Sequence, residues 1–104
     1  MPLMSLQAIE SLCYDALVSV GASDAQAAVV AEEIADAEAE GIRNVGLGYM
    51  HLYLKHLRCG KVKAGAQPKI VKTSAAATVI DADFGFCHHA YLQGEARLIE
   101  TARE

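Results

Sequence analysis

Apolar residues recur at steps of three and four positions in two early stretches of the chain, which is the spacing of one face of an α-helix. The first stretch follows Ser5, a side chain that can cap a helix, and stops at Gly21. Its apolar positions are Leu6, Ile9, Cys13, Leu17 and Val20. The second follows Ser23, stops at Gly41 and places Gln26 at the spacing of a capping box. We therefore expect two amphipathic helices here.

A third helical spacing begins after a short connection at residues 42–44 and stops at Gly60. Its apolar positions are Leu47, Met50, Leu54 and Leu57.

The second helix is acidic, through Glu32, Glu33, Asp36, Glu38 and Glu40. Charge on a helix is usually solvated surface, so we favour that interpretation over a docking face for a basic partner.

The second half of the chain has strand character at residues 70–71 and 78–80, with a turn predicted at 74–76. A last helix is expected from about His88. Its apolar positions are Leu92, Ala96, Ile99 and Ala102. Two strands alone are marginally stable, so this ribbon would be left exposed and further sequence is expected. The predicted fold class is α+β and mostly helical: residues 1–104 form a single unit that is part of a larger fold.

Composition excludes several classes of protein. Hydrophobic residues make up 53% of the chain, too many for a disordered segment. The net charge is −4 and the nine Lys and Arg are scattered, so no nucleic-acid partner is expected. No apolar run reaches the roughly 20 residues that span a bilayer, and no signal peptide is recognisable. Three widely spaced cysteines, Cys13, Cys59 and Cys87, indicate reduced thiols and a cytoplasmic location.

Several short motifs occur in an order that resembles the malate/L-lactate dehydrogenase-like family of NAD(P)-dependent oxidoreductases. The first are residues 37–46, Tyr53-Leu54 and residues 57–60. The later ones are Pro68, residues 78–83, Gly85-Phe86 and residues 102–104. The resemblance extends over essentially the whole chain, but over only the first third or so of a family member.

This resemblance implies hydride transfer between a nicotinamide cofactor and a small 2-oxo acid, 2-hydroxy acid or cyclic imine, on a fold distinct from the Rossmann type. Family members are typically dimers. NAD or NADP would be held mostly by sequence beyond this chain, which contains no glycine-rich phosphate-binding motif. We therefore expect no cofactor binding by this chain alone, and its expected partner is a second copy or a missing C-terminal portion.

The chain departs from the family at the catalytic position. The family has Ser-His-Gly, where the His donates a proton, and this chain has Asn44-Val45-Gly46. Valine has no titratable group, so no catalytic residue is intact. A family Arg that would bind a substrate carboxylate is replaced by Tyr49, whereas Tyr53 matches. The substrate-pocket candidates are Asn44, Val45, Tyr49 and Tyr53.

Helical spacing places Val45, Tyr49 and Tyr53 on one side of the third helix, beside its apolar stripe. Such an aromatic pair could line a pocket. It is more often the edge of a core or a subunit interface, and we favour that alternative.

His88 and His89 follow Cys87 without the spacing of metal ligands, so no metal site is predicted and both histidines are expected at the surface.

Asp81 and Asp83 are spaced so that their carboxylates would point the same way on a strand. Paired catalytic acids have this spacing, but Asp residues before a Gly more often form turns, which we favour.

Three functions remain open. The chain is the N-terminal fragment or split part of an oxidoreductase, a catalytically silent helical module for dimerisation or partner binding, or a small acidic adaptor. Whether it is an enzyme stays open.

Overall fold

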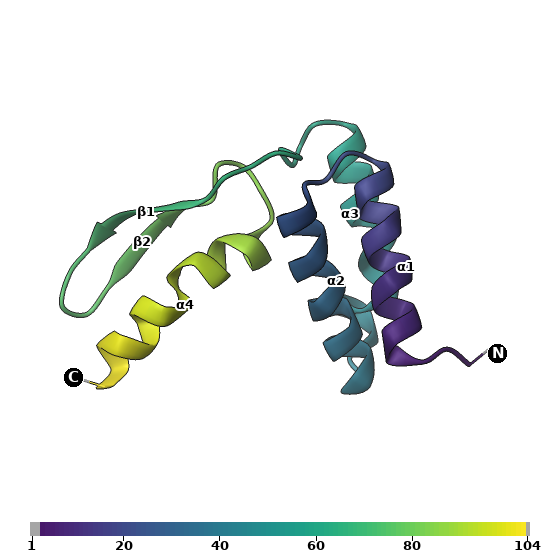
Figure 1. Cartoon of the computed structure of the whole chain (residues 1–104), viewed down its shortest axis with the longest axis horizontal. Helices are drawn as coiled ribbons and strands as arrows, with labels where there is room; N and C mark the ends of the chain where they lie inside the picture. The colour runs from purple at the N-terminus through teal and green to yellow at the C-terminus, as the bar shows by residue number, and fades with distance from the viewer. Residues whose placement is uncertain (1–2, 104) are drawn as a thin grey trace.

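The computed structural model describes residues 3–103, and the side chain of Arg43 lies outside what it describes. Its elements are α1 (Leu6–Ser19), α2 (Asp24–Ala39), the short 3-10 turns η1 (Arg43–Val45) and η2 (Leu47–Tyr49), α3 (Met50–Arg58), β1 (Lys69–Thr73), β2 (Thr78–Asp81) and α4 (Cys87–Arg103). Helices α1 to α3 form a bundle, and the β1–β2 hairpin with α4 forms an arm beside it (Figure 1). The predicted α+β, mostly helical class is confirmed.

The first two helices begin and end where their capping residues predict. Ser5 Oγ accepts a hydrogen bond from Ala8 N at 3.0 Å, and Ser23 Oγ accepts one from Gln26 N at 3.3 Å. Gly21 and Gly41 follow the two helices with φ of 101° and 76°, a conformation that glycine adopts without steric cost. Local sequence signals therefore suffice to fix both helices.

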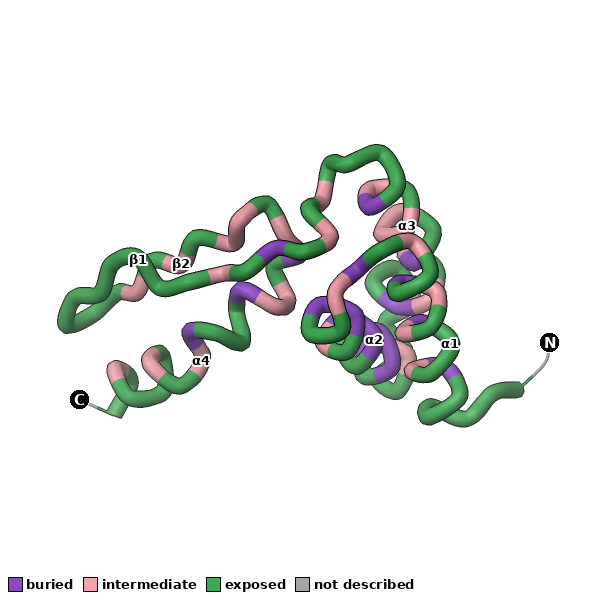
Figure 2. The backbone as a smooth tube through the Cα atoms, turned by 45° about the horizontal axis from the view of Figure 1, so that its top comes forward, coloured by how far each residue is buried: buried purple, intermediate pink, exposed green. Residues whose placement is uncertain are grey.

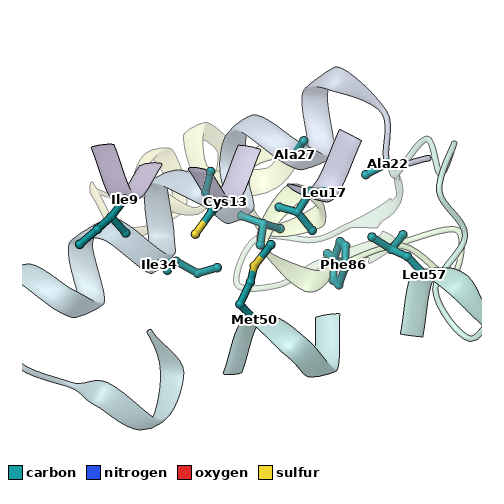
Figure 3. Close-up of a cluster of buried hydrophobic side chains, with 11 residues drawn as sticks. Ile9, Cys13, Leu17, Ala22, Ala27, Ile34, Met50, Leu57 and Phe86 are labelled. Carbon is teal, nitrogen blue, oxygen red and sulfur yellow. The ribbon is translucent and has the colours of Figure 1, made fainter. Parts of the chain in front are cut away.

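The core lies inside the helical bundle. Figure 2 shows the buried segments gathered on α2 and on its neighbours, while most of the hairpin is exposed. The buried apolar cluster consists of Ile9, Cys13, Leu17, Ala22, Ala27, Val30, Ala31, Ile34, Met50, Leu57 and Phe86. Side chains of α1 point toward Ile34 and Met50 in Figure 3. The apolar periodicity of α1 and α2 thus predicts their packing faces.

The prediction of one continuous third helix from the start of its apolar spacing is wrong. Two 3-10 turns occupy residues 43–49, and the α-helix begins only at Met50. Gly46 interrupts the helix, with φ −95° and ψ −139°. The half-buried Glu38 accepts a hydrogen bond from Leu47 N at 2.8 Å and lies so close to Gly46 that a Cβ there would overlap it. Glu38 of α2 is therefore more than a solvated surface charge, because its side chain also binds the segment before α3.

The arm is an antiparallel hairpin with one helix on it. Lys69 pairs with Asp81 and Thr73 with Thr78, and the register shifts between Ile70 and Lys72. Helix α4 packs on the hairpin where Gly94 lets it approach the side chain of Ile80. All of β1 stays exposed. None of the described helices is long and apolar enough to cross a membrane.

The arm is joined to the bundle through Gln26, whose side chain is fully buried. Its Nε2 donates to Lys63 O at 3.0 Å and to Ala64 O at 2.8 Å, and its Oε1 accepts from Phe86 N at 2.8 Å. The predicted capping box is thus only half formed, because Ser23 N donates to Ala64 O instead. Gln26 therefore connects α2 to the loop after α3 and to the start of α4 through hydrogen bonds.

Asp81, the last residue of β2, and Asp83 after it form a turn, as favoured from the sequence. Asp83 N donates to Asp81 Oδ1 at 2.8 Å, and Asp83 has φ 55°. Asp83 Oδ2 accepts from Gln67 N at 3.1 Å and from Lys63 Nζ at 3.0 Å. The backbone hydrogen bond from Gln67 and then the hydrogen bond from Lys63 hold the pKa of Asp83 below its ordinary value. Both carboxylates therefore act in local structure.

Candidate functional site

Four ring side chains meet where the bundle and the arm join, and we name them the aromatic–imidazole cluster: Tyr49, Tyr53, Phe86 and His88. The Tyr53 ring lies at its centre. Ring centroids are 4.9 Å away for Tyr49, 5.3 Å for Phe86 and 5.6 Å for His88, all with edge-to-face geometry. This arrangement is the one that the charge distribution of aromatic rings favours. The cluster therefore has a defined geometry and connects η2, α3 and α4.

Tyr53 and His88 are also at hydrogen-bond distance, with 3.4 Å between Tyr53 Oη and His88 Nε2. The other ring nitrogen, Nδ1, lies 3.9 Å from Cys87 Sγ. Burial lowers the pKa of His88, and Glu33 opposes the change. Burial raises the pKa of Tyr53, with smaller contributions from Cys87, Tyr49 and Glu33. Both side chains are therefore uncharged at neutral pH.

The four pocket candidates from the sequence are placed differently. Tyr49 and Tyr53 are half-buried and in contact, whereas Asn44 and Val45 are exposed in the 3-10 turn before them. Val45 is 47% exposed. Because that turn is not part of α3, the expectation that Val45 shares a helix side with both tyrosines is wrong. His88, which is expected at the surface from the sequence alone, reaches Tyr53 because the start of α4 packs against α2.

A separate open cavity of about 440 Å³ lies between α1 and α2. It is lined by Gln7, Glu10, Ser11, Tyr14, Asp15, Ala28, Ala31 and Glu32. At its edge the Tyr14 hydroxyl donates to Asp24. No member of the aromatic–imidazole cluster lines this cavity, so the cluster and not the cavity coincides with the residues singled out by the sequence.

The family model for malate/L-lactate dehydrogenase matches residues 4–104. The chain belongs to the malate/L-lactate dehydrogenase family. It is 36% identical over 102 residues to the (2R)-3-sulfolactate dehydrogenase (NADP(+)) of Chromohalobacter salexigens, covering 98% of this chain and 30% of that protein. It is 33% identical over 101 residues to the Δ1-pyrroline-2-carboxylate reductase of Ancylobacter novellus, covering 97% and 30%.

A solved structure of a reductase has the same fold as this chain. The Δ1-piperideine-2-carboxylate reductase of Pseudomonas syringae superposes with a TM-score of 0.92 at 30% identity, over 99% of this chain and 31% of that one. This family member therefore spans about a third of the length of the relatives that it matches. It corresponds to their N-terminal portion.

The nicotinamide dinucleotide used in this family needs donors for its phosphates, such as free backbone N–H groups at a helix start or unpaired basic side chains. At the start of α4, Phe86 N already donates to Gln26. Lys63, on the loop beside it, is paired with Asp83 at 3.0 Å. Phe86 N and Lys63 are therefore not free to bind the pyrophosphate of the cofactor. In the described part of the chain, no group of three or more His, Cys, Asp and Glu is arranged to hold a metal ion.

The lowered pKa of His88 predicts a pH dependence of stability in this family member. Above the ordinary value of 6.5, His88 is neutral in both the folded and the unfolded chain. Below that value the unfolded chain binds a proton before the folded one does, so the free energy of unfolding falls as the pH falls toward the lower, folded pKa. We expect His88→Gln to weaken this dependence. Urea unfolding of both chains between pH 7 and 5 measures it, and parallel declines would contradict the assignment.

Proposed function

We propose that this chain forms the N-terminal, substrate-side part of an NAD(P)-dependent oxidoreductase and acts only together with a portion that holds the cofactor. The observation that carries the proposal is the match of nearly the whole chain to about 30% of each relative. Relatives named for sulfolactate and cyclic imine carboxylates support a small 2-oxo acid, 2-hydroxy acid or cyclic imine as substrate.

Within this proposal Tyr49 and Tyr53 form the wall of the substrate pocket, and Asn44 and Val45 lie at its rim. The contact between the two tyrosine rings and their half-buried position support this role. Val45 cannot donate a proton, so general-acid catalysis from this position is absent. Since the sequence contains no glycine-rich phosphate-binding motif, we expect NAD or NADP to bind to the additional portion. The chain alone is inactive.

The valine at position 45 favours a second function. A chain that lacks the family's proton donor could serve as a catalytically inactive module for dimerisation or partner binding. The arm offers a surface for this role. Its exposed apolar side chains are Ile70, Val71, Val79, Tyr91, Leu92, Leu98 and Ile99. Exposed apolar side chains, where they gather into a patch, are typical of an interface. The partner would be a second copy or the missing C-terminal portion, and the free cysteines are consistent with the cytoplasm.

The two functions are separated by supplying the missing part. We would join the chain after its last residue to the portion of the Pseudomonas syringae reductase that this chain does not cover, and follow NADPH oxidation with Δ1-piperideine-2-carboxylate. The oxidoreductase proposal predicts slow turnover above that of the added portion alone. The silent-module alternative predicts a folded, NADPH-binding protein without turnover. A joined protein that neither binds NADPH nor turns over, beside an active full-length reductase, contradicts the oxidoreductase proposal.

A further inference from the structure

His88 has a geometry that suits the orientation of another side chain. Its ring is held edge-to-face against Tyr53, with centroids 5.6 Å apart, and against Phe86, with centroids 6.1 Å apart. Its two nitrogens have different neighbours, Tyr53 Oη at Nε2 and Cys87 Sγ at Nδ1. A neutral imidazole has one nitrogen that donates and one that accepts, and the partner of the first nitrogen sets the role of the second.

Two arrangements of hydrogens are compatible with these neighbours. If Nδ1 carries the hydrogen, Tyr53 donates to Nε2 and offers only oxygen lone pairs to a ligand. If Nε2 carries it, Cys87 can donate its S–H to Nδ1, Nε2–H donates to Tyr53, and the Tyr53 hydrogen is free to point outward. A thiol donor beside Nδ1 favours the second arrangement, because sulfur is a weak acceptor.

We propose that His88 is a positioning residue for Tyr53: it donates from Nε2 to the Tyr53 oxygen and so directs the Tyr53 O–H toward the acceptor atom of a bound substrate. This rests on the proposed function, in which Tyr53 lines the substrate pocket. Carbonyl oxygen, imine nitrogen and carboxylate oxygen all accept such a bond. The chain thus retains an oriented hydrogen-bond donor at this site although position 45 has lost its imidazole.

The lowered pKa of His88 agrees with this role, because the proposed hydrogen bonds need a neutral ring in which only Nε2 carries a hydrogen. The groups that bear on the ring are Tyr53 of α3, Cys87 of α4 and Glu33 of α2. Glu33 favours the protonated ring, and burial outweighs it.

The first arm of the test uses the isolated chain and does not depend on activity. Nitrogen NMR of the His88 ring at neutral pH reports which nitrogen carries the hydrogen. We expect the Nε2–H form, and we expect Cys87→Ala to shift the population toward Nδ1–H. A dominant Nδ1–H form in the unaltered chain would overturn the proposal.

The second arm uses the joined protein described above. His88→Ala is expected to lower kcat/KM for Δ1-piperideine-2-carboxylate by about tenfold, the effect of one hydrogen bond. His88→Gln, whose amide can donate from the same place, should restore most of that loss, and the exposed His51→Gln should change nothing. If Gln does not restore it, or if His88→Ala leaves kcat/KM unchanged, the proposal is wrong. Inactivity of every joined protein would instead contradict the proposed function, and the NMR result would still decide the role of His88.

Discussion

Replacing Gln26 with Ala is expected to lower the free energy of unfolding by about 3 kcal/mol or more. The substitution removes the acceptor of the buried Phe86 N–H and one of the two hydrogen bonds that Lys63 O and Ala64 O each accept. It also opens a cavity, because the Gln26 side chain is 0% exposed. Urea unfolding followed by circular dichroism, with linear extrapolation to water, measures the change.

The matched control is Gln93→Ala, which removes the same side chain from an exposed position on α4. Its effect should stay within about 0.5 kcal/mol. Because Gln26 joins α2 to the loop and the arm, its loss should also increase hydrogen exchange at the start of α4 more than in α1. Equal effects of the two substitutions would show that the arm is not held through Gln26.

Restoring the family's catalytic triplet is expected to raise activity by about 10² to 10⁴-fold. The substitutions are Val45→His and Asn44→Ser, made in the joined protein that carries the added portion of the Pseudomonas syringae reductase. The reason is that an imidazole at position 45 can again donate the proton at the substrate. Since Val45 is 47% exposed, the new side chain should fit without loss of stability. NADPH oxidation with Δ1-piperideine-2-carboxylate measures the gain.

Two controls accompany this test. Ile42→His places an imidazole on an exposed neighbouring position, 43% exposed, and should give no gain. The same two substitutions in the chain without the added portion should also give none. Failure of Val45→His with Asn44→Ser in a joined protein that binds both NADPH and substrate would refute the claim that this chain has inherited the active-site geometry of its family.

Local signals predict the first half of the fold well. Ser5, Gly21, Ser23 and Gly41 determine where α1 and α2 begin and end, because capping and left-handed glycines act within a few residues of the chain. The strand character of residues 70–71 and 78–80 also depends on local residue types, and both stretches lie within the observed β1 and β2. The segment before α3 was not predicted, since its shape depends on a hydrogen bond from Leu47 to Glu38 in a different helix.

The candidate site could be predicted only in part. Tyr49 and Tyr53 are neighbours on one segment, so helical spacing brings them together. His88 reaches Tyr53 across 35 residues, and Gln26 reaches Lys63 and Ala64 across 37 and 38 residues. Such contacts depend on how α4 and the loop pack, and no periodicity in the sequence records that packing. Residues that connect distant elements were therefore assigned to caps or to the surface.

We propose that this family member binds the cofactor only through an additional portion. Light scattering of the purified chain, with the fluorescence of NADH or NADPH followed in the same sample, would test this proposal. We expect a dimer or larger association through the exposed apolar arm and no fluorescence response. A monomer that enhances the cofactor fluorescence would overturn the proposal, because this chain would then bind the nucleotide by itself.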